Sequence, residues 1–450
     1  MKAFHAYDIR GVYNQDFNKE DAYKIGFFLP ELLKTNKILV GRDVRVSSPE
    51  IFEFLSRGIL DAGADVYDAG LTTTPMVYWL TAKFRFNASV MVTASHNSKE
   101  YNGLKVSRSK AKPVGYATGL SDLEKLMSKE IVVSSKKGNV FPFDKKEEYL
   151  TFLEQYIPSN LQNLNLTIDC SNGMAALLVK DIVGENHHYL FDTLDGSFPN
   201  HDANPLVAEN IVDLQKAVME NKSDLGIIFD GDADRVMFVD ENGSFISPDL
   251  MIAVMGHYFL KSDGEKTHVL QDIRSSKAVG EYLQKIGNVE MHTWKVGRAF
   301  ASLKLADIDG QFGGELAGHY YFRDFFYSDS GMLAMLIILE VIADMKAKGK
   351  SVSQLIADIK AYANSGEINF KIENKIGAMD AVKTYFESHE NVDKLMDFDG
   401  YRLEFSDWWF NIRPSNTEPY LRLIVEAKSE ELLKEKLDKI VGIIDFVKGQ

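Results

Sequence analysis

The chain has 450 residues, of which 45% are hydrophobic and 26% are charged, and these are ordinary values for a globular protein. The length predicts roughly three domains. The formal net charge of −14 excludes nucleic acid or an anionic membrane as the main partner, because both need a surplus of positive surface, but it leaves room for a small anionic substrate.

The only cysteine is Cys170, so no disulfide can form within the chain, as is typical of a reducing compartment. The first residues carry no apolar signal-peptide core. The longest apolar run, from Met332 to Leu339, is far too short to span a bilayer. We therefore expect a cytoplasmic protein with no membrane partner.

Residues 1–145 form the first expected unit, in which strands and helices alternate. The pattern predicts strands at 37–42, 64–68 and 88–92 and a helix at 49–62. Such alternation is typical of an α/β unit with a mostly parallel sheet.

The segment Thr93-Ala94-Ser95-His96-Asn97 follows the last of these strands. Ser95 would then lie just past the carboxyl end of a strand, where open α/β folds bind ligands, and Lys105 returns toward the same place. Taken singly, such residues often only hydrogen-bond the turn. Arg10, beside the turn residue Gly11, would by itself be typical of a solvated surface group.

Residues 146–246 form a second expected α/β unit, with strands at 165–170 and 225–229. The second strand leads into Asp230-Gly231-Asp232-Ala233-Asp234-Arg235. Three carboxylates so close together repel one another unless a cation lies among them, and oxygen ligands suit Mg²⁺ or Ca²⁺.

A calcium-binding loop is the main alternative, because Asp230, Asp232, Asp234 and Glu241 match four positions of that pattern. However, Arg235 stands where the sharp turn needs glycine, and the flanking segments read as strands where helices are required. We therefore favour a catalytic Mg²⁺ loop.

Residues 247–361 form a third expected α/β unit, with a helix at 251–260, strands at 268–270 and 288–293, and a buried helix after Gly331. Gly314-Glu315-Leu316-Ala317-Gly318-His319 would bring backbone close to a ligand and present an acceptor and a donor. A tight turn with a surface carboxylate is an equally good interpretation.

Residues 362–450 read as a smaller α+β domain, with strands at 368–372, 401–405 and 421–425 and a helix at 429–447. The loop after 412 gathers donors that suit the oxygens of a phosphate: Arg413, Ser415, Asn416 and Thr417. A polar turn is the simpler alternative. The chain has neither a glycine-rich nucleotide loop nor a His-Glu-x-x-His zinc helix.

Together, the loops at 93–97, 230–235, 314–319 and 413–419 resemble those of the α-D-phosphohexomutase family, in its phosphomannomutase/phosphoglucomutase branch. The resemblance spans nearly the whole chain. It implies three related α/β domains and a smaller fourth domain arranged around a central cleft.

The resemblance also implies the roles of individual residues. Ser95 would carry a phosphoryl group, and the metal ligands would be Ser95, Asp230, Asp232 and Asp234. Arg10, Lys105 and Arg235 match positions near the reacting phosphate. The substrate-binding positions would be Lys295, Glu315, His319, Arg413, Ser415, Asn416 and Thr417.

The activity implied is interconversion of hexose 1-phosphate and hexose 6-phosphate, with mannose or glucose as the sugar, Mg²⁺ as cofactor and a hexose 1,6-bisphosphate as intermediate and activator. Such a mechanism mostly needs positioning and charge neutralisation. We assign proton transfer to Lys105 and charge stabilisation to Arg10. We expect a monomer or a homodimer.

One departure from the family pattern concerns the sugar, because Ala317 stands where this branch usually has serine. A lost hydrogen bond costs about 0.5 to 1.5 kcal/mol, so the choice of hexose is left open. The alternatives are a phosphoglucosamine mutase, a metal-dependent phosphatase in which water intercepts phosphorylated Ser95, and a non-catalytic sugar-phosphate sensor. The sensor is disfavoured because binding alone needs no nucleophile.

Overall fold

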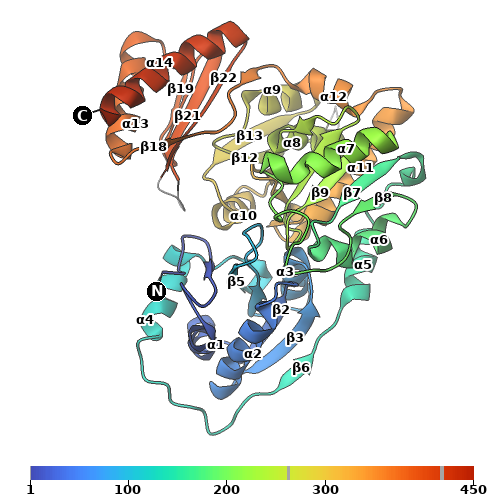
Figure 1. Cartoon of the computed structure of the whole chain (residues 1–450), viewed down its shortest axis with the longest axis vertical. Helices are drawn as coiled ribbons and strands as arrows, with labels where there is room; N and C mark the ends of the chain where they lie inside the picture. Colours follow the sequence, from blue (N-terminus) through green and yellow to red (C-terminus); the bar gives the residue numbers. More distant parts are fainter. Residues whose placement is uncertain (1, 261–263, 416–419, 450) are drawn as a thin grey trace.

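The computed structural model describes residues 2–260, 264–415 and 420–449. Four β-sheets follow one another along the chain, and helices cover them (Figure 1). The first three units are α/β and the fourth is a mainly antiparallel sheet with two helices, which confirms the expected fold class. The predicted strands and helices are present, with ends displaced by at most three residues.

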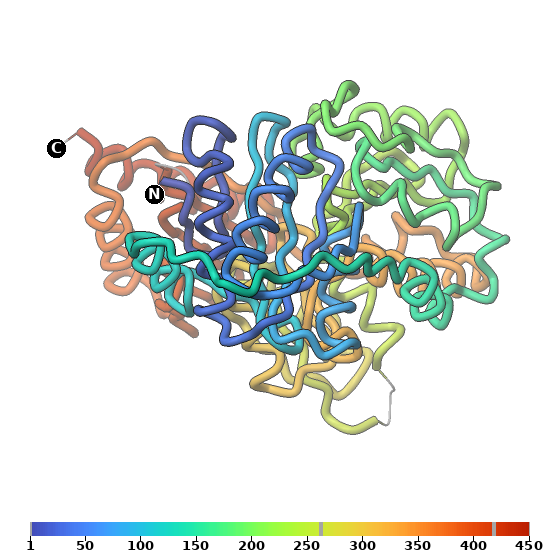
Figure 2. The backbone as a smooth tube through the Cα atoms, turned by 90° about the horizontal axis from the view of Figure 1, so that it is seen from below, coloured from blue at the N-terminus to red at the C-terminus, as the bar shows by residue number. Residues whose placement is uncertain are grey.

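The first sheet has the strand order β1-β5-β4-β2-β3-β6. Its strands are β1 (Ile9–Val12), β2 (Lys37–Arg42), β3 (Asp65–Leu71), β4 (Ala88–Val92), β5 (Tyr101–Arg108) and β6 (Val140–Pro142). Its helices are α1 (Lys19–Leu33), α2 (Ser48–Asp61), α3 (Thr74–Lys83) and α4 (Leu120–Leu126). After α4 the chain runs along the outside of this unit and adds β6 before it enters the second unit (Figure 2).

The second sheet has the order β11-β10-β9-β7-β8. Its strands are β7 (Leu166–Asp169), β8 (His188–Leu190), β9 (Leu225–Phe229), β10 (Val236–Asp240) and β11 (Phe245–Ile246). The helices of this unit are α5 (Lys146–Glu154), α6 (Val179–Val183) and α7 (Val212–Asn221).

The third sheet has the order β13-β12-β14-β15-β16. Its strands are β12 (Thr267–Asp272), β13 (Val289–Trp294), β14 (Phe312–Gly314), β15 (Tyr320–Phe322) and β16 (Ser328–Asp329). The helices are α8 (Pro248–Phe259), α9 (Lys277–Ile286), α10 (Arg298–Asp307), α11 (Gly331–Ala347) and α12 (Val352–Ile359).

These three sheets share one topology. In each, a central strand (β2, β7 or β12) has two parallel neighbours, and one of these neighbours (β4, β9 or β14) pairs with an antiparallel strand that follows it in sequence. The short connection between these last two strands carries Ser95 in the first unit, Asp230 to Asp234 in the second and Glu315 to His319 in the third. The three sequence motifs therefore occupy equivalent positions.

The apolar run from Met332 to Leu339 is a buried helix, as predicted. It is the first half of α11, every residue of the run is at most 1% exposed, and the helix packs against α8 and β10. Ser330 begins the helix because its hydroxyl accepts a hydrogen bond from the Leu333 N–H. This helix lies in a hydrophobic core that joins the second and third units.

The fourth unit has a core of its own, in which α13 (Lys375–His389) and α14 (Glu430–Lys448) pack on its sheet (Figure 1). The strand order is β17-β22-β21-β20-β19, and β18 also pairs with β22. The strands are β17 (Ala363–Asn364), β18 (Ile368–Lys371), β19 (Lys394–Met396), β20 (Tyr401–Glu404), β21 (Trp408–Pro414) and β22 (Tyr420–Ala427).

Candidate active site

The three equivalent loops meet around a cavity of about 160 Å³. Backbone pairing between Arg235 and His319 joins the second loop to the third, and a hydrogen bond from Ser95 Oγ to Asp230 Oδ2, 2.8 Å long, joins the first to the second. Ser95, Lys105, Asp234 and Glu315 all line the cavity. The structure thus brings together motifs that lie more than 200 residues apart in the sequence.

Ser95 is held in a strained backbone conformation with φ of +52°, in the left-handed region that non-glycine residues rarely adopt. Its N–H donates to the Thr93 hydroxyl at 2.9 Å, and the side chain is almost fully buried. The strand before it, β4, is buried at every position. A rigid strand and a tight turn therefore fix the position of the Ser95 hydroxyl.

Arg45 anchors the Ser95 loop through hydrogen bonds, and the sequence analysis did not identify this arginine. Its guanidinium is fully buried, and its Nη2 donates to the carbonyl oxygen of Ser95 at 2.7 Å. Further bonds run to the carbonyl oxygens of Asn97, Ser98 and Tyr101. Arg45 was hard to find in sequence because its partners are backbone oxygens some 50 residues away.

The three aspartates are fully buried, and their oxygens converge within 4.8 Å of one another. Burial, together with the negative charges of Asp234 and Asp232, raises the pKa of Asp230 well above its usual value. Burial would also raise the pKa of Asp234, but Lys105 and His319 outweigh it and hold that pKa below its usual value. The three carboxylates therefore lie together without enough positive charge around them to neutralise all three.

The oxygens of this cluster fit a divalent cation. Asp232 Oδ1 and Asp234 Oδ1 are buried and have no hydrogen-bond partner, which leaves ligand atoms free. Lys105 Nζ lies 2.6 Å from Asp232 Oδ2 and 2.5 Å from Asp234 Oδ2, so an ammonium group already supplies positive charge there. Carboxylate oxygens in such a group are the ligands that Mg²⁺ prefers.

Lys105 is protonated in this arrangement. Burial alone would lower its pKa, but the carboxylates of Asp232 and Asp234 raise the pKa above that of an ordinary lysine. In the absence of a bound cation, Lys105 is therefore a proton donor rather than a base.

The calcium-loop alternative is wrong. Strand β10 lies between Asp234 and Glu241, so these two residues are at opposite ends of that strand. Glu241 instead accepts hydrogen bonds from the hydroxyl and N–H of Ser353. A calcium loop would need Glu241 to fold back onto the aspartates.

Glu315 and His319 are buried, and they are not surface residues of a simple turn. Glu315 accepts hydrogen bonds from the Gly297 N–H at 2.5 Å and from the Tyr321 hydroxyl at 2.6 Å. Arg235 Nε donates to His319 Nε2, so His319 Nδ1 is the nitrogen that donates to Asp329 Oδ2, 2.7 Å away. These contacts fix the orientation of both side chains toward the cavity.

Arg298 and Asp329 were also missed, although both stand beside segments that the sequence analysis singled out. Arg298 Nε donates to Asp329 Oδ1 at 3.0 Å, and its guanidinium lies 3.6 Å from the centre of the Tyr78 ring. Although burial opposes it, His319 and Arg298 lower the pKa of Asp329 to about 2. Arg298 thus adds another fixed cation to the cavity.

Arg10 is not a solvated surface group. Its Nη1 donates to Asn97 Oδ1 at 2.7 Å and its Nη2 to Asp8 Oδ2 at 2.5 Å, and the side chain lines the cavity beside Ser95. The edge strand β1 pairs with β5, which also carries Lys105. One strand pair therefore delivers both cations.

The fourth unit reaches the site through Asp399. Arg413 is buried, with Nη2 3.1 Å from Asp399 Oδ1, while Asp399 Oδ2 accepts from the Val296 N–H of the third unit at 2.9 Å. Ser415 follows β21, and Asn416 and Thr417 lie outside the described residues. Lys295 Nζ lies over the Phe300 ring, and Lys295 is not among the described residues that line the cavity.

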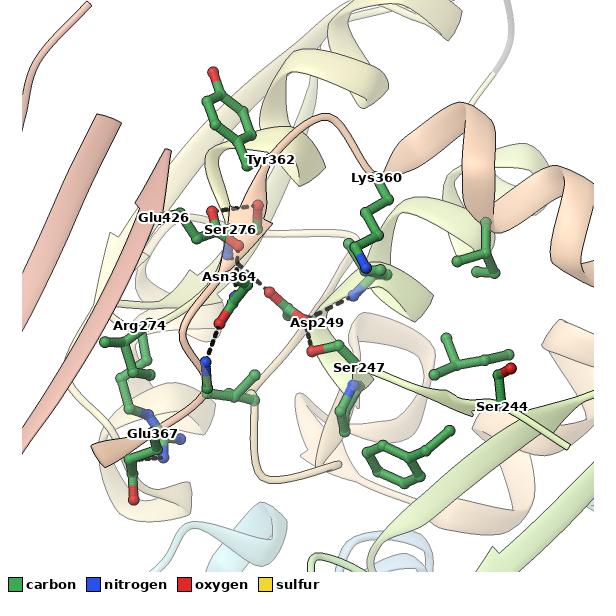
Figure 3. A pocket seen from close by; sticks show the side chains of 18 of the residues that line it. Ser244, Ser247, Asp249, Arg274, Ser276, Lys360, Tyr362, Asn364, Glu367 and Glu426 are labelled. Carbon is green, nitrogen blue, oxygen red and sulfur yellow. Dashed lines mark hydrogen bonds and ion pairs between the residues drawn. The ribbon is translucent and has the colours of Figure 1, made fainter. Parts of the chain in front are cut away.

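A larger cavity of about 790 Å³ lies elsewhere, where the second, third and fourth units meet (Figure 3). Its polar wall includes Asp249, Ser276, Asn364 and Glu426. It contains none of the residues that the motifs predict for the chemistry, so we assign it no catalytic role.

Comparison with known families decides what this architecture is. The models for α/β/α domains I, II and III of phosphoglucomutase/phosphomannomutase match residues 1–131, 147–243 and 247–362, and the model for the C-terminal domain matches residues 367–443. The chain belongs to the phosphoglucomutase/phosphomannomutase family. The resemblance that the motifs indicated is confirmed.

Curated relatives of this family match over their full length. A phosphomannomutase of Methanocaldococcus jannaschii is 34% identical over 452 residues, which cover 99% of this chain and 98% of the relative. A phosphomannomutase of Vibrio cholerae is 36% identical over 466 residues, with the same coverage.

Solved structures agree. A phosphoglucomutase/phosphomannomutase family protein from Burkholderia thailandensis superposes with a TM-score of 0.88 at 26% identity and covers 99% of this chain and 98% of that one. An Aspergillus fumigatus N-acetylphosphoglucosamine mutase in complex with GlcNAc-6P and magnesium has a TM-score of 0.54 at 13% identity, with 91% of this chain and 82% of that one covered, and supports the fold alone.

None of the described helices is long and apolar enough to cross a membrane.

Proposed function

We propose that this chain interconverts hexose 1-phosphates and hexose 6-phosphates, with mannose or glucose as the sugar, through phosphorylated Ser95 and a hexose 1,6-bisphosphate intermediate. As a member of its family, the chain is an intramolecular phosphotransferase. The observation that carries the catalytic assignment is the contact of the Ser95 hydroxyl with Asp230. This contact supports the proposal, because the Ser95 hydroxyl is buried, its backbone is strained, and it lies beside three carboxylates of the type that bind Mg²⁺.

The first half of the reaction moves a phosphoryl group from Ser95 to the sugar. The Ser95 Oγ–P bond breaks, the free hydroxyl of the hexose monophosphate forms a new O–P bond, and that hydroxyl loses its proton. Lys105, which is protonated, donates a proton to the departing Ser95 oxygen and takes up the proton that the sugar hydroxyl loses, so it ends the step protonated. Arg10 and Arg298 stabilise the negative charge on the phosphoryl oxygens.

The second half returns the other phosphoryl group. After the bisphosphate turns around in the cavity, Ser95 Oγ attacks the second phosphorus, and the bond from that phosphorus to the sugar oxygen breaks. Lys105 donates a proton to the leaving sugar oxygen and takes up the proton that the Ser95 hydroxyl loses. Ser95 thus regains a phosphoryl group and the product carries its phosphate on the other carbon. Asp230, Asp232, Asp234 and an oxygen of phosphorylated Ser95 would hold Mg²⁺, and a cation there neutralises charge on the group in transit.

The remaining groups bind the substrate. Glu315 accepts from sugar hydroxyls, His319 contacts them, and Arg235 orients His319 through its Nε. Arg413, with Ser415, Asn416 and Thr417 beside it in sequence, grips the phosphate that is not reacting. Lys295 lies next to Val296 and Gly297, which contact Asp399 and Glu315, so a small movement of that loop would bring it to the substrate.

Two observations bear on the choice of sugar. The two relatives described above are named phosphomannomutases. Ala317 lines the cavity but offers no hydroxyl to the sugar. A phosphoglucosamine mutase is the closest alternative, and a metal-dependent sugar phosphatase is a more distant one.

The deciding experiment measures conversion of mannose 1-phosphate, glucose 1-phosphate and glucosamine 1-phosphate to their 6-phosphates, with Mg²⁺ and a trace of glucose 1,6-bisphosphate. We expect turnover of the first two. Turnover of the third alone would identify a phosphoglucosamine mutase. Release of inorganic phosphate without isomerisation would identify a phosphatase and refute the proposal.

A further inference from the structure

Two histidines and a glutamate converge on one face of the third sheet, on strands whose side chains the mutase reaction does not use. They are His268 of β12 and Glu290 and His292 of the neighbouring β13. Their ligand atoms lie within 4.8 Å of one another.

The strand register explains why these three side chains meet. Strands β12 and β13 are parallel, with His268 opposite Glu290 and Leu270 opposite His292. Opposed residues in a sheet point to the same side, and so do residues two apart on one strand. His268 therefore points to the same face as Glu290 and His292.

The three ligand atoms lie close enough together to share one ion. His268 Nδ1 and His292 Nε2 are joined by a hydrogen bond of 2.9 Å, which an ion between them would replace. Glu290 Oε1 lies 3.7 Å from His292 Nε2, and Glu290 Oε2 lies 4.0 Å from His268 Nδ1. Zinc binds nitrogen at about 2.0–2.1 Å and carboxylate oxygen at about 2.0–2.2 Å, so small side-chain rotations would place all three atoms on one ion.

The surroundings are compatible with such an ion. Both imidazoles are partly buried at the surface of the sheet, which leaves their ring nitrogens close to one another and within reach of an entering ion. All three side chains are partly exposed, so an ion can enter and water can complete its coordination. The nearby cations are Lys266, which pairs with Glu290 at 3.1 Å, and Lys304, which lies over the Trp294 ring.

We propose that His268, Glu290 and His292 form a second metal site, separate from the aspartate cluster, which binds a divalent transition-metal ion such as Zn²⁺. Two imidazoles and one carboxylate select Zn²⁺ or Co²⁺ over Mg²⁺, which prefers oxygen ligands. The ion would cross-link the edge strand β13 to β12. Because it binds the folded chain, it would also raise the melting temperature.

Calorimetric titration with Zn²⁺, in buffer with excess Mg²⁺ to occupy the aspartate cluster, tests this inference. We expect one Zn²⁺ site per chain, with an affinity reduced by about tenfold or more in His268→Gln and in His292→Gln. The matched control is His389→Gln, which removes an exposed histidine of α13 and should leave the affinity unchanged. The Zn²⁺-dependent rise in melting temperature should disappear in the same two variants and persist in the control.

Co²⁺ gives a second readout, because its visible absorption reports the coordination of the ion directly. The wild type should show the bands of a four-coordinate site, and Glu290→Gln, which keeps both imidazoles, should weaken binding without abolishing it. Circular dichroism checks that each variant is folded, and Glu290→Gln serves if a histidine variant is not. Unchanged Zn²⁺ affinity in the folded variants, or binding to the wild type only through the aspartate cluster, would overturn the inference.

Discussion

Ser95 combines three properties that rarely occur together in a serine: a left-handed backbone, nearly complete burial and a carboxylate partner. Strain of this kind costs of order 1–3 kcal/mol and persists only where the surroundings impose it. Here Arg45 imposes it, through hydrogen bonds to four carbonyl oxygens of the loop. The hydrogen bonds of the buried Arg45 thus fix the position of the Ser95 hydroxyl.

Replacement of Ser95 by alanine should abolish isomerisation, with a loss of at least about a thousandfold, because no other group can carry the phosphoryl intermediate. Sugar-phosphate binding should remain measurable by calorimetry. Ser98→Ala, in the same loop, should retain activity. Phosphoryl transfer that persisted in Ser95→Ala would remove Ser95 from the proposed mechanism.

Asp232→Asn should raise the Mg²⁺ concentration needed for half-maximal activity by about tenfold or more, since an amide is a weaker ligand than a carboxylate. The measurement is a Mg²⁺ titration at saturating substrate. Asp213→Asn, on the exposed surface of α7, is the control. An unchanged Mg²⁺ dependence would contradict the assignment of the aspartate cluster.

At the scale of elements, the site is built from the same type of strand-to-strand loop in each of three units. Each of the three loops joins a parallel strand to its antiparallel neighbour, and each contains a residue with positive φ: Ser95, Ala233 and Gly318, at +52°, +62° and +83°. A left-handed residue lets the chain reverse within a few residues. The equivalent loops of three units thereby carry the residues that we propose as the nucleophile, the metal ligands and the sugar-binding groups.

The end of β21 and the loop after it contribute differently, because they belong to the fourth unit and include Arg413, which we propose binds the phosphate that does not react. Arg413→Ala should raise KM by about tenfold or more with a smaller change in kcat, as expected for the loss of a charged hydrogen bond to a phosphate that does not react. Steady-state kinetics would measure both constants. Arg323→Ala, at an exposed position of the third unit, provides the control, and a normal KM for Arg413→Ala would refute the phosphate role.

At the scale of the whole molecule, the fourth unit docks on the third through buried polar contacts. Arg402 Nη1 donates to the carbonyl oxygens of Ile273 and Ser275. Glu426 accepts from Ser276 of the third unit and from Asn364 of its own unit, each at 2.7 Å (Figure 3). It also accepts from Trp409 of its own unit at 2.7 Å. Because Arg413 belongs to the fourth unit, we expect these contacts to influence substrate binding at a distance from the site.

Glu426 makes this junction sensitive to pH. Burial, followed by the charge of Asp249, raises the pKa of Glu426 from 4.5 to about 7. Because the folded-state pKa is the higher one, the stability that Glu426 contributes is fully present below pH 4.5 and is lost as the pH rises through 7. The shift corresponds to about 3 kcal/mol.

Glu426→Gln should therefore flatten the pH dependence of stability between pH 5 and 8. The measurement is urea unfolding followed by tryptophan fluorescence, which reports on this junction because Trp409 donates to Glu426. Glu373→Gln, at an exposed position, should behave as the wild type. Parallel pH profiles for wild type and Glu426→Gln would contradict the assignment.

The sequence by itself determined the strands, the helices and the loops that carry chemistry. Periodicity located Ala88–Val92 and Leu225–Phe229, and the polar residues that follow them marked the site. These signals are local, since they depend on residues within one turn or one strand. They also sufficed for the resemblance to the family and hence for the fold class.

Only the tertiary structure determined the protonation states of the site residues and the contacts that hold these residues in place. The protonation of Lys105 depends on two aspartates more than 120 residues away, and the roles of Arg45, Arg298 and Glu426 depend on partners in other loops or other units. Burial and long-range charge set these properties, and neither leaves a periodic pattern in the sequence. Local sequence patterns predicted which residues we expect to react. The contacts between distant segments determined which groups hold those residues in position.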